Sequence, residues 1–230
     1  MTERLPSATT PLERATTNCG AKAAGLRWLI DAGYPVPDGI IVTSADDPAL
    51  VDWVDPSRQY AVRSSASVED TAEHSFAGQF ATELRVVGLE AIREAIRRVI
   101  ASSHEERLRP YLEHAELTPD DVRVCAIVQE MVEAEAAGVA FSRNPLTGLA
   151  DVVIETVAGT GERLMRGEVT PERWIHHWGD WTRRPASSAV PTAVMNEVAG
   201  TVVAIAEARG EPVDIEWCWD GEAVQLLQVR

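Results

Sequence analysis

The final third of the sequence changes from a helical to a strand period within a few residues. Val194, Val198, Val202 and Ile205 recur at helical spacing and predict a helix over 192–208. Two apolar segments without proline follow, at 213–217 and 224–229, and Asp220-Gly221 between them is typical of a hairpin turn. A helix followed directly by an antiparallel hairpin predicts a mixed α and β fold.

The rest of the chain repeats this mixture. Apolar residues at helical spacing predict further helices over 20–32, 89–102 and 105–116. Apolar runs bounded by turn residues predict strands at 40–43, 60–63, 80–86, 121–132, 138–142 and 152–157. The fold class expected from this order is α+β, and the strand at 121–132 is expected to cross between two lobes.

Local signals refine these boundaries. Asn18 is suited to cap the first helix and Gly33 to end it, while Pro110 should kink or divide the helix at 105–116. The polar stretch 64–79 is expected to be a loop. Residues 1–17 are polar and rich in Thr and Pro, so a flexible N-terminus is expected.

Composition excludes several classes of partner and site. The 230 residues carry 36 acidic and 21 basic side chains, a formal net charge of −15, and no run of Lys or Arg. Such a chain repels nucleic acid and anionic membranes. Its three widely spaced cysteines argue against a disulfide framework or a zinc site. No signal peptide or membrane-length apolar stretch is evident, so a cytoplasmic location is expected.

A small-residue segment with one lysine opens the first predicted helix. It reads Gly20-Ala21-Lys22-Ala23-Ala24-Gly25, and Lys22 is the only lysine in the chain. Small residues let a ligand approach the backbone, and a helix N-terminus favours anions. The segment therefore fits a phosphate group, although an ordinary surface helix rich in alanine explains the same residues.

A second candidate places Arg63 at the end of a strand, before a hydroxyl-rich segment. The strings AVRSSASVED at 61–70 and SFAGQ at 75–79 combine a guanidinium with hydroxyl groups and loop amides. A planar guanidinium and neutral backbone donors suit phosphate oxygens. A serine-rich turn without a ligand is the alternative interpretation.

The third candidate is the C-terminal hairpin. A strand that alternates apolar and acidic residues presents Asp214 and Glu216 on one face, and Gln228 lies on the opposite strand. Carboxylate and amide oxygens suit Mg²⁺, although an exposed polar face explains them too. A strict two-residue turn would place Glu216 and Gln228 on opposite faces, so this site requires an odd-length turn or a bulge, with Gly221 at a left-handed position.

Two weaker candidates remain. Gly159-Thr160-Gly161-Glu162 is either a loop that covers phosphate or a flexible turn. His176 and His177 are neighbours on a predicted strand and therefore point to opposite faces, which favours packing over metal binding.

Five segments in order resemble the ATP-binding domain of the phosphoenolpyruvate synthase and pyruvate phosphate dikinase family, which includes the rifampin phosphotransferases. They cover most of residues 18–230, and they are GAKAAGLRWLIDAGYPVPDGIIVT, VRSSASVEDTAEHSFAGQ, VQEMVEAEAAGVAFSRNPLTG, GTGERLMRGEVTPERW and VDIEWCWDGEAVQLLQVR. The resemblance implies a short stand-alone form of an ATP-grasp domain, with ATP in a cleft between a first lobe at 18–130 and a second lobe at 131–230.

The resemblance also implies roles for individual residues. Lys22 and Arg63 would hold phosphates, and Arg230 would contact the terminal phosphates, which makes these three the catalytic candidates. The remaining nucleotide and metal positions are Gly78 and Thr82 along the nucleotide, Gln129 with the backbone of Glu130 to Val132 at the adenine, and Glu216 and Gln228 at Mg²⁺.

Several features depart from the family pattern. Only fifteen residues separate Ser44 from Tyr60, where relatives carry a longer segment, and the glycine loop reads GTGE instead of GLGE. None of the five histidines stands in the Thr-Ser-His-Gly context of the phosphorylated histidine. The leading hypothesis is therefore an ATP-dependent phosphotransferase component that passes phosphate to a histidine on a separate protein, or to a small molecule. The alternatives are a non-catalytic nucleotide-binding regulatory or scaffold module and an ATP-grasp ligase.

Overall fold

The computed structural model describes residues 9–67, 81–102, 109–114, 117–118, 122–165, 167–177 and 179–230. The chain divides into two compact units. Unit 1 comprises Met1–Gly33 and Pro37–Met131, and unit 2 comprises Tyr34–Val36 and Val132–Arg230. The division after Met131 lies one residue beyond the lobe boundary expected from the sequence.

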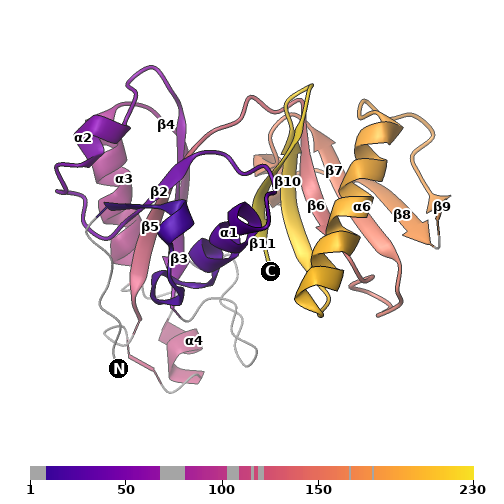
Figure 1. The fold of residues 1–230 in the computed structure, drawn as a ribbon, viewed down its shortest axis with the longest axis horizontal. Coiled ribbons are helices and arrows are strands. Elements are labelled where there is room, and N and C mark those ends of the chain that lie inside the picture. The colour runs from indigo at the N-terminus through magenta and orange to yellow at the C-terminus, as the bar shows by residue number, and fades with distance from the viewer. Residues whose placement is uncertain are drawn as a thin grey trace. The chain divides into compact units, whose positions relative to one another are not determined.

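The described part of unit 1 is built on an antiparallel sheet in the order β1-β2-β5-β3-β4 (Figure 1). Its strands are β1 (Thr9–Pro11), β2 (Gly39–Val42), β3 (Tyr60–Ala66), β4 (Thr82–Val86) and β5 (Val124–Glu130). The central strands β5 and β3 consist largely of buried residues, as expected for strands that are covered on both faces.

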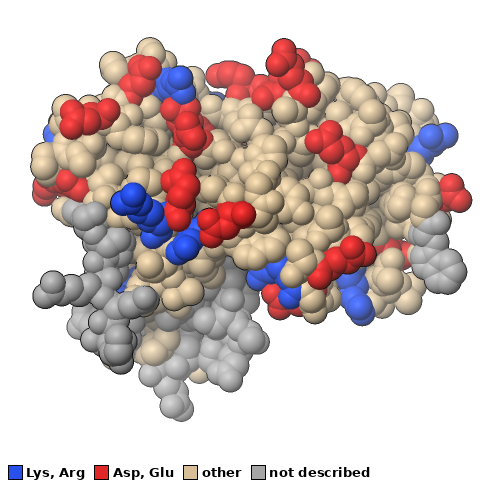
Figure 2. All heavy atoms as spheres, in the orientation of Figure 1, with Lys and Arg blue, Asp and Glu red and all other residues tan. Residues whose placement is uncertain are grey.

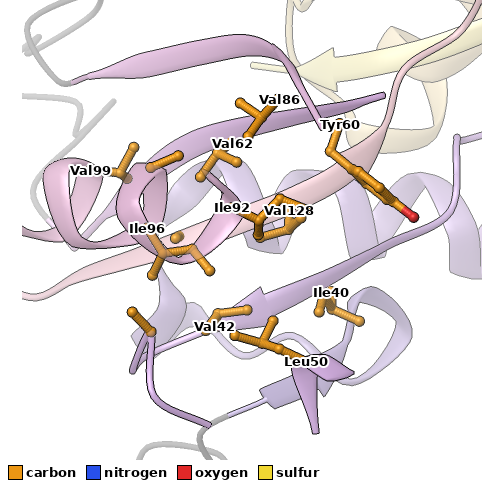
Figure 3. Packing of buried hydrophobic residues seen from close by; sticks show 13 residues of the cluster. Ile40, Val42, Leu50, Tyr60, Val62, Val86, Ile92, Ile96, Val99 and Val128 are labelled. Atoms are coloured by element: carbon orange, nitrogen blue, oxygen red, sulfur yellow. The ribbon is translucent and has the colours of Figure 1, made fainter. Parts of the chain in front are cut away.

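Helices cover the two faces of this sheet. The helical elements of unit 1 are η1 (Leu12–Arg14), η2 (Thr17–Cys19), α1 (Ala21–Asp31), α2 (Leu50–Trp53), α3 (Leu89–Ala101) and α4 (Arg109–His114). On one face, Ile92, Ile96 and Val99 of α3 pack against Val62 and Val128, and all five side chains are completely buried (Figure 3). The start of α1 contacts the opposite face, because it forms a hydrogen bond with Ser65. Side chains alternate along β3, and the residues of β3 that pack in the core with α3 have even numbers, so Ser65 points to the other side of the sheet.

Unit 2 is an antiparallel sheet with one long helix against it. In the described residues the strand order is β11-β10-β6-β7-β8-β9, and α6 contacts β6, β7, β10 and β11 (Figure 1). The elements are β6 (Ala136–Phe141), β7 (Val152–Ala158), α5 (Glu162–Met165), β8 (Glu172–His177), β9 (Asp180–Arg183), α6 (Thr192–Arg209), β10 (Asp214–Trp219) and β11 (Val224–Val229).

The apolar side chains at helical spacing in α6 form part of the core of unit 2. Val198, Val202 and Ile205 of α6 are completely buried, together with Ile215 and Trp217 of β10. Because Ile215 and Trp217 alternate along β10, they occupy one face, and Asp214 and Glu216 occupy the other. The core therefore lies on the face covered by α6, and the polar candidates lie on the opposite face.

The described N-terminal residues form regular structure. Residues 9–14 supply β1 and η1, and Leu12 in η1 and Ala15 directly after it are each only 1% exposed. Residues 1–8 lie outside the described residues, so the flexibility expected of 1–17 stays a prediction. Burial of these apolar side chains outweighs the polar composition around them. Asn18 is not the cap of α1, because the helix starts after Gly20, which holds φ +90° as its N-cap.

The boundary of β3 differs from the sequence prediction. The strand expected to end at Arg63 continues as β3 to Ala66, because Ser64, Ser65 and Ala66 pair with β5. The helix expected over 105–116 is described only as α4 (Arg109–His114), and residues 103–108 and 115–116 lie outside the described residues, so the kink or division at Pro110 stays a prediction.

On the face shown in Figure 2, the charged side chains form no single block. Figure 2 shows Asp and Glu side chains spread over the face in view, with Lys and Arg side chains between some of them. Within the described ranges, no helix combines the length and the apolar character required to span a bilayer.

Candidate functional site

The N-terminus of α1 is fixed directly onto the end of β3. Gly20 lies so close to this strand that a Cβ atom added to it would be 2.6 Å from both the Ala66 carbonyl oxygen and Ser65 Oγ. The Ala23 amide donates to Ser65 Oγ at 3.1 Å. Ser65 therefore caps a helix from a distant strand, and glycine is required at position 20 for both its φ and its lack of a side chain.

This contact brings two of the predicted phosphate ligands to one side of the unit 1 sheet. Lys22 is the second residue of α1, and Arg63 precedes Ser65 by two residues on β3, so Arg63 and Ser65 share a face. Both Lys22 and Arg63 are half-buried. Thr82 lies directly opposite Arg63 on β4 and is exposed. Gly78, the remaining candidate of this group, lies outside the described residues.

The segment predicted to meet the adenine is held by several hydrogen bonds of its own. Gln129 is 2% exposed, and its Nε2 donates to the Pro37 carbonyl at 3.0 Å. The amides of Glu130 and Met131 donate to the carbonyls of Asp38 and Gln59, each at 2.9 Å. Three donors of this segment, Gln129 Nε2 and the amides of Glu130 and Met131, are therefore already engaged within the protein. The Glu130 side chain forms an ion pair with Arg58.

The hairpin of unit 2 contains a bulge, which is one of the two arrangements, an odd-length turn or a bulge, expected from the sequence. Trp219 pairs with Val224 and Trp217 with Leu226, but beyond a register shift Glu216 pairs with Gln228. Leu227 is the extra residue, and Gly221 in the turn has φ +97°. The bulge places Glu216 and Gln228 directly opposite each other and on one face, so this prediction is confirmed.

Asp214 and Arg230 extend the same face by one further pair. Their backbones exchange both hydrogen bonds, at 3.0 and 2.9 Å. Arg230 Nε lies 3.2 Å from Asp214 Oδ2, and Arg230 Nη2 lies 3.8 Å from Glu216 Oε1. The guanidinium is thus oriented by Asp214 beside the Glu216 carboxylate, and its side chain is about one quarter exposed.

Sequence reasoning missed a second ion pair on this face. Pairing across the sheet aligns Gln228, Glu216, Val139, Glu155 and Arg173 in one row over five strands. Glu155 accepts hydrogen bonds from Arg173, one of them from Nε at 2.9 Å. Since the row depends on the register of four strand pairs, no local sequence signal could have identified it. The polar side chains thus extend from β11 to β8.

The oxygen donors of the hairpin fit a magnesium ion. Among the described residues no three His, Cys, Asp or Glu side chains are placed to bind a metal ion. Glu216 and Gln228 supply one carboxylate and one amide, which suits Mg²⁺ because this ion keeps water and substrate phosphate as its other ligands. The neighbouring Arg230 guanidinium favours a phosphate group at the same place.

The weaker candidates have structural explanations. The rings of His176 and Trp181 are 5.1 Å apart, and His177 Nδ1 lies 2.5 Å from Asp151 Oδ1, which supports packing and pairing over metal binding. Gly159 follows β7 with φ +75°, and its amide donates to the Glu135 carbonyl at 2.7 Å. A phosphate-covering role of 159–162 stays a prediction.

Comparison with known proteins decides the family. The family described as "Pyruvate phosphate dikinase, AMP/ATP-binding domain" matches residues 48–188, more than half of the chain. The chain belongs to this family. A "Probable phosphoenolpyruvate synthase" of Methanothermobacter thermautotrophicus is 36% identical in a match that covers 74% of this chain and 29% of that protein. A "Rifampicin phosphotransferase" of Streptomyces sp is 33% identical in a match that covers 90% of this chain and 27% of that protein.

The fold is also shared with more distant proteins. An acetyl-coenzyme A synthetase of Ca. Korarchaeum cryptofilum, solved in complex with coenzyme A and Ca-AMPCP, matches 90% of each chain with a TM-score of 0.54 and 12% identity. This likeness shows the fold alone, and the ATP-grasp prediction is confirmed. The protein is thus an ATP-binding domain of the dikinase family, and it spans under a third of the length of the two curated relatives.

Proposed function

We propose that this domain binds ATP with Mg²⁺ and acts as the nucleotide component of a phosphotransferase. The acceptor is a histidine on a separate protein or a small molecule. The observation that carries the proposal is the bulged hairpin, which puts Asp214, Glu216, Gln228 and Arg230 on one face. Two oxygen ligands beside an oriented guanidinium suit a metal–triphosphate complex. The proposal includes a cytoplasmic location for the protein, because ATP is the phosphate donor.

Each residue of the hairpin has a distinct task. Glu216 and Gln228 would hold Mg²⁺, which neutralises charge on the phosphate oxygens when bound. Arg230 contributes a planar fork to the terminal phosphates, and Asp214 keeps that fork oriented through the 3.2 Å contact. A lysine at position 230 would keep the charge but lose the fork, so arginine is the better residue here.

Unit 1 would supply the remaining positive charges and the base site. Lys22, at the N-terminus of α1, and Arg63, on the face where α1 begins, would bind phosphate oxygens. Thr82 and Gly78 would lie along the nucleotide, and the segment from Gln129 to Val132 would meet the adenine. The tight contact of Gly20 with β3 favours this role because it holds the start of α1 rigidly.

The chemistry asked of these residues is positioning and charge stabilisation. In the transfer, an acceptor lone pair forms a bond to phosphorus while the bridging P–O bond breaks and its electrons leave with the nucleotide. Charge on the phosphoryl oxygens is then stabilised by Lys22, Arg63 and Arg230. No covalent intermediate on this domain is required.

Phosphate transfer from labelled ATP tests the proposal. Candidate acceptor proteins, starting with products of neighbouring genes, are incubated with [γ-³²P]ATP or [β-³²P]ATP in the presence of this domain. We expect label on an acceptor only when the domain is present, with an acid-labile bond if the acceptor is histidine, and loss of label with Glu216→Gln. Unchanged labelling by Glu216→Gln would contradict the assigned site. Failure with every neighbouring protein would count against transfer to a separate histidine.

A non-catalytic nucleotide-binding module is the second candidate. The short connection between Ser44 and Tyr60, which holds only the four-residue helix α2, favours it because the family resemblance implies a longer segment there. Calorimetry would then show ATP binding, while no ATP is consumed with any acceptor. The retained Lys22, Arg63, Glu216, Gln228 and Arg230 favour the catalytic proposal.

A further inference from the structure

Two of the three cysteines meet beneath the start of α1. Cys19 is the last residue of η2, directly before Gly20, and Cys125 is the second residue of β5. Cys19 is 0% and Cys125 1% exposed. Cys19 Sγ also lies 3.8 Å from Thr16 Oγ1. Neither thiol belongs to the proposed nucleotide site.

The strand register places the two thiols together. Cys125 lies directly opposite Ser65, and directly opposed residues of antiparallel strands project to the same face with Cβ atoms about 5 Å apart. Ser65 Oγ accepts a hydrogen bond from the Ala23 amide and lies where a Cβ atom on Gly20 would project. The face of β3 that carries Ser65 is therefore the face on which η2 ends and α1 begins. Cys125 therefore projects to the side of the sheet on which Cys19 lies, and each thiol shifts the pKa of the other.

We propose that Cys19 and Cys125 are a redox-active pair, which a hydroperoxide oxidises to a reversible disulfide. The bond would join the end of η2 to β5 and thereby fix the N-terminus of α1 covalently to the sheet. The proposal goes beyond nucleotide binding and does not depend on it.

The environment assigns different roles to the two sulfurs. The hydrogen bond from Cys125 lowers the pKa of Cys19 to about 6, and the same bond together with burial raises the pKa of Cys125. Of the two sulfurs, Cys19 is therefore the one that would act as the nucleophile. Cys218, on β10 in unit 2, is the opposite case, because burial raises its pKa to about 12.

The oxidation balances with a hydroperoxide as the two-electron oxidant. The Cys19 thiolate attacks the terminal peroxide oxygen, the O–O bond breaks, and the alcohol or water leaves after taking up a proton, which gives a sulfenic acid. The Cys125 sulfur then attacks the Cys19 sulfur, and its proton leaves with the hydroxyl group as water. A dithiol reductant reverses the bond by exchange.

Peptide mapping of the intact chain tests the pair. The folded protein is treated with hydrogen peroxide, the remaining thiols are alkylated, and the digest is analysed by mass spectrometry without reduction. We expect a peptide that joins Cys19 to Cys125, that disappears with dithiothreitol, and that forms equally in Cys218→Ser. In Cys125→Ser, Cys19 should accumulate as a sulfenic acid that dimedone traps. Oxidation mainly at Cys218, or two unmodified thiols at positions 19 and 125 in folded protein, would overturn the proposal.

A second readout does not depend on the variants folding well. The rate of peroxide oxidation of the wild-type protein should rise with pH around a midpoint near 6, where the Cys19 thiolate forms. The oxidised protein should also unfold at a temperature several degrees above the reduced protein, because the bond closes a long loop of the unfolded chain. A midpoint near 8.5 together with an unchanged unfolding temperature would refute the pair.

Discussion

Glu216 and Gln228 lie directly opposite each other on β10 and β11, although the turn between these strands does not by itself place them so. Pairing from the turn runs through Trp219 with Val224 to Trp217 with Leu226, which would bring Leu227 opposite Glu216. The bulge at Leu227 moves Gln228 into that position instead. The carboxylate and the amide share a face because of one extra residue.

This relationship predicts opposite outcomes for a deletion and an insertion. Deleting Leu227 makes Gln228 the residue after Leu226, so Gln228 stays opposite Glu216 and the Kd for Mg·ATP should change by less than about threefold. Inserting alanine after Leu227 places the alanine opposite Glu216 and should weaken binding by about tenfold or more, roughly 1.4 kcal/mol. Calorimetry on both variants, with circular dichroism as the folding control, measures this. An equal loss of Mg·ATP affinity in the two variants would refute the pairing of Glu216 with Gln228 as the basis of the site.

Gly20 should tolerate no side chain. Gly20→Ala places a Cβ 2.6 Å from the Ala66 carbonyl oxygen and requires φ +90°, so we expect a loss of about 2 kcal/mol or more in the free energy of unfolding, and weaker ATP binding. Gly200→Ala is the matched control. Nothing lies within 4 Å of a Cβ at that position of α6, and alanine should stabilise the helix by about 1 kcal/mol. Equal unfolding midpoints for the two variants in urea would contradict this account.

Gln129 should matter first for stability. Its Nε2 holds the buried Pro37 carbonyl, so Gln129→Leu should lower the free energy of unfolding by about 1–3 kcal/mol. Gln59→Leu serves as the control, because Gln59 is exposed and contributes its backbone carbonyl to Met131. If Gln129→Leu leaves thermal unfolding unchanged but weakens ATP binding, the side chain acts on the base and not on Pro37.

Asp220 should make the hairpin sensitive to acid. Hydrogen bonds from the backbone amides of Ala223 and Glu222 lower the pKa of Asp220. The carboxylate thus contributes stability above the ordinary pKa of an aspartate, about 3.9, and this contribution is lost as the pH falls through the lowered pKa. In Asp220→Asn the free energy of unfolding should therefore decrease less steeply as the pH falls than in the wild type. Asp52→Asn, at an exposed position of α2, should not have this effect. Identical acid unfolding of Asp220→Asn and wild type would contradict this.

Periodic elements were predictable from the sequence, and their pairings were not. The helix at 192–208 and the two C-terminal strands were read from apolar spacing, and α6, β10 and β11 confirm them. For Glu216 and Gln228 to share a face, parity required an odd-length turn or a bulge in the hairpin, but no local sequence signal placed a bulge at Leu227. The Glu155–Arg173 pair, which joins β7 to β8, depends on the strand register and could not be predicted from the sequence.

Burial explains two segments whose structure the local sequence did not indicate. Leu12 and Ala15 are isolated in a polar segment, so their spacing carries no helical or strand period, yet both are buried in unit 1. Ser64 and Ser65 are typical of turns, but both are completely buried in β3, and Ser65 accepts the Ala23 amide there. Tertiary contacts therefore override the local preference of these residues.

Calorimetric titration of ATP with and without Mg²⁺, on wild type and Glu216→Gln, tests the central claim most directly. Glu222→Gln, an exposed change in the turn of the same hairpin, is the matched control. We expect wild type and Glu222→Gln to bind Mg·ATP at least about tenfold more tightly than ATP with a chelator, and Glu216→Gln to lose that difference. Binding of ATP by Glu216→Gln that still improves tenfold with Mg²⁺ would contradict the assignment of the metal to this hairpin.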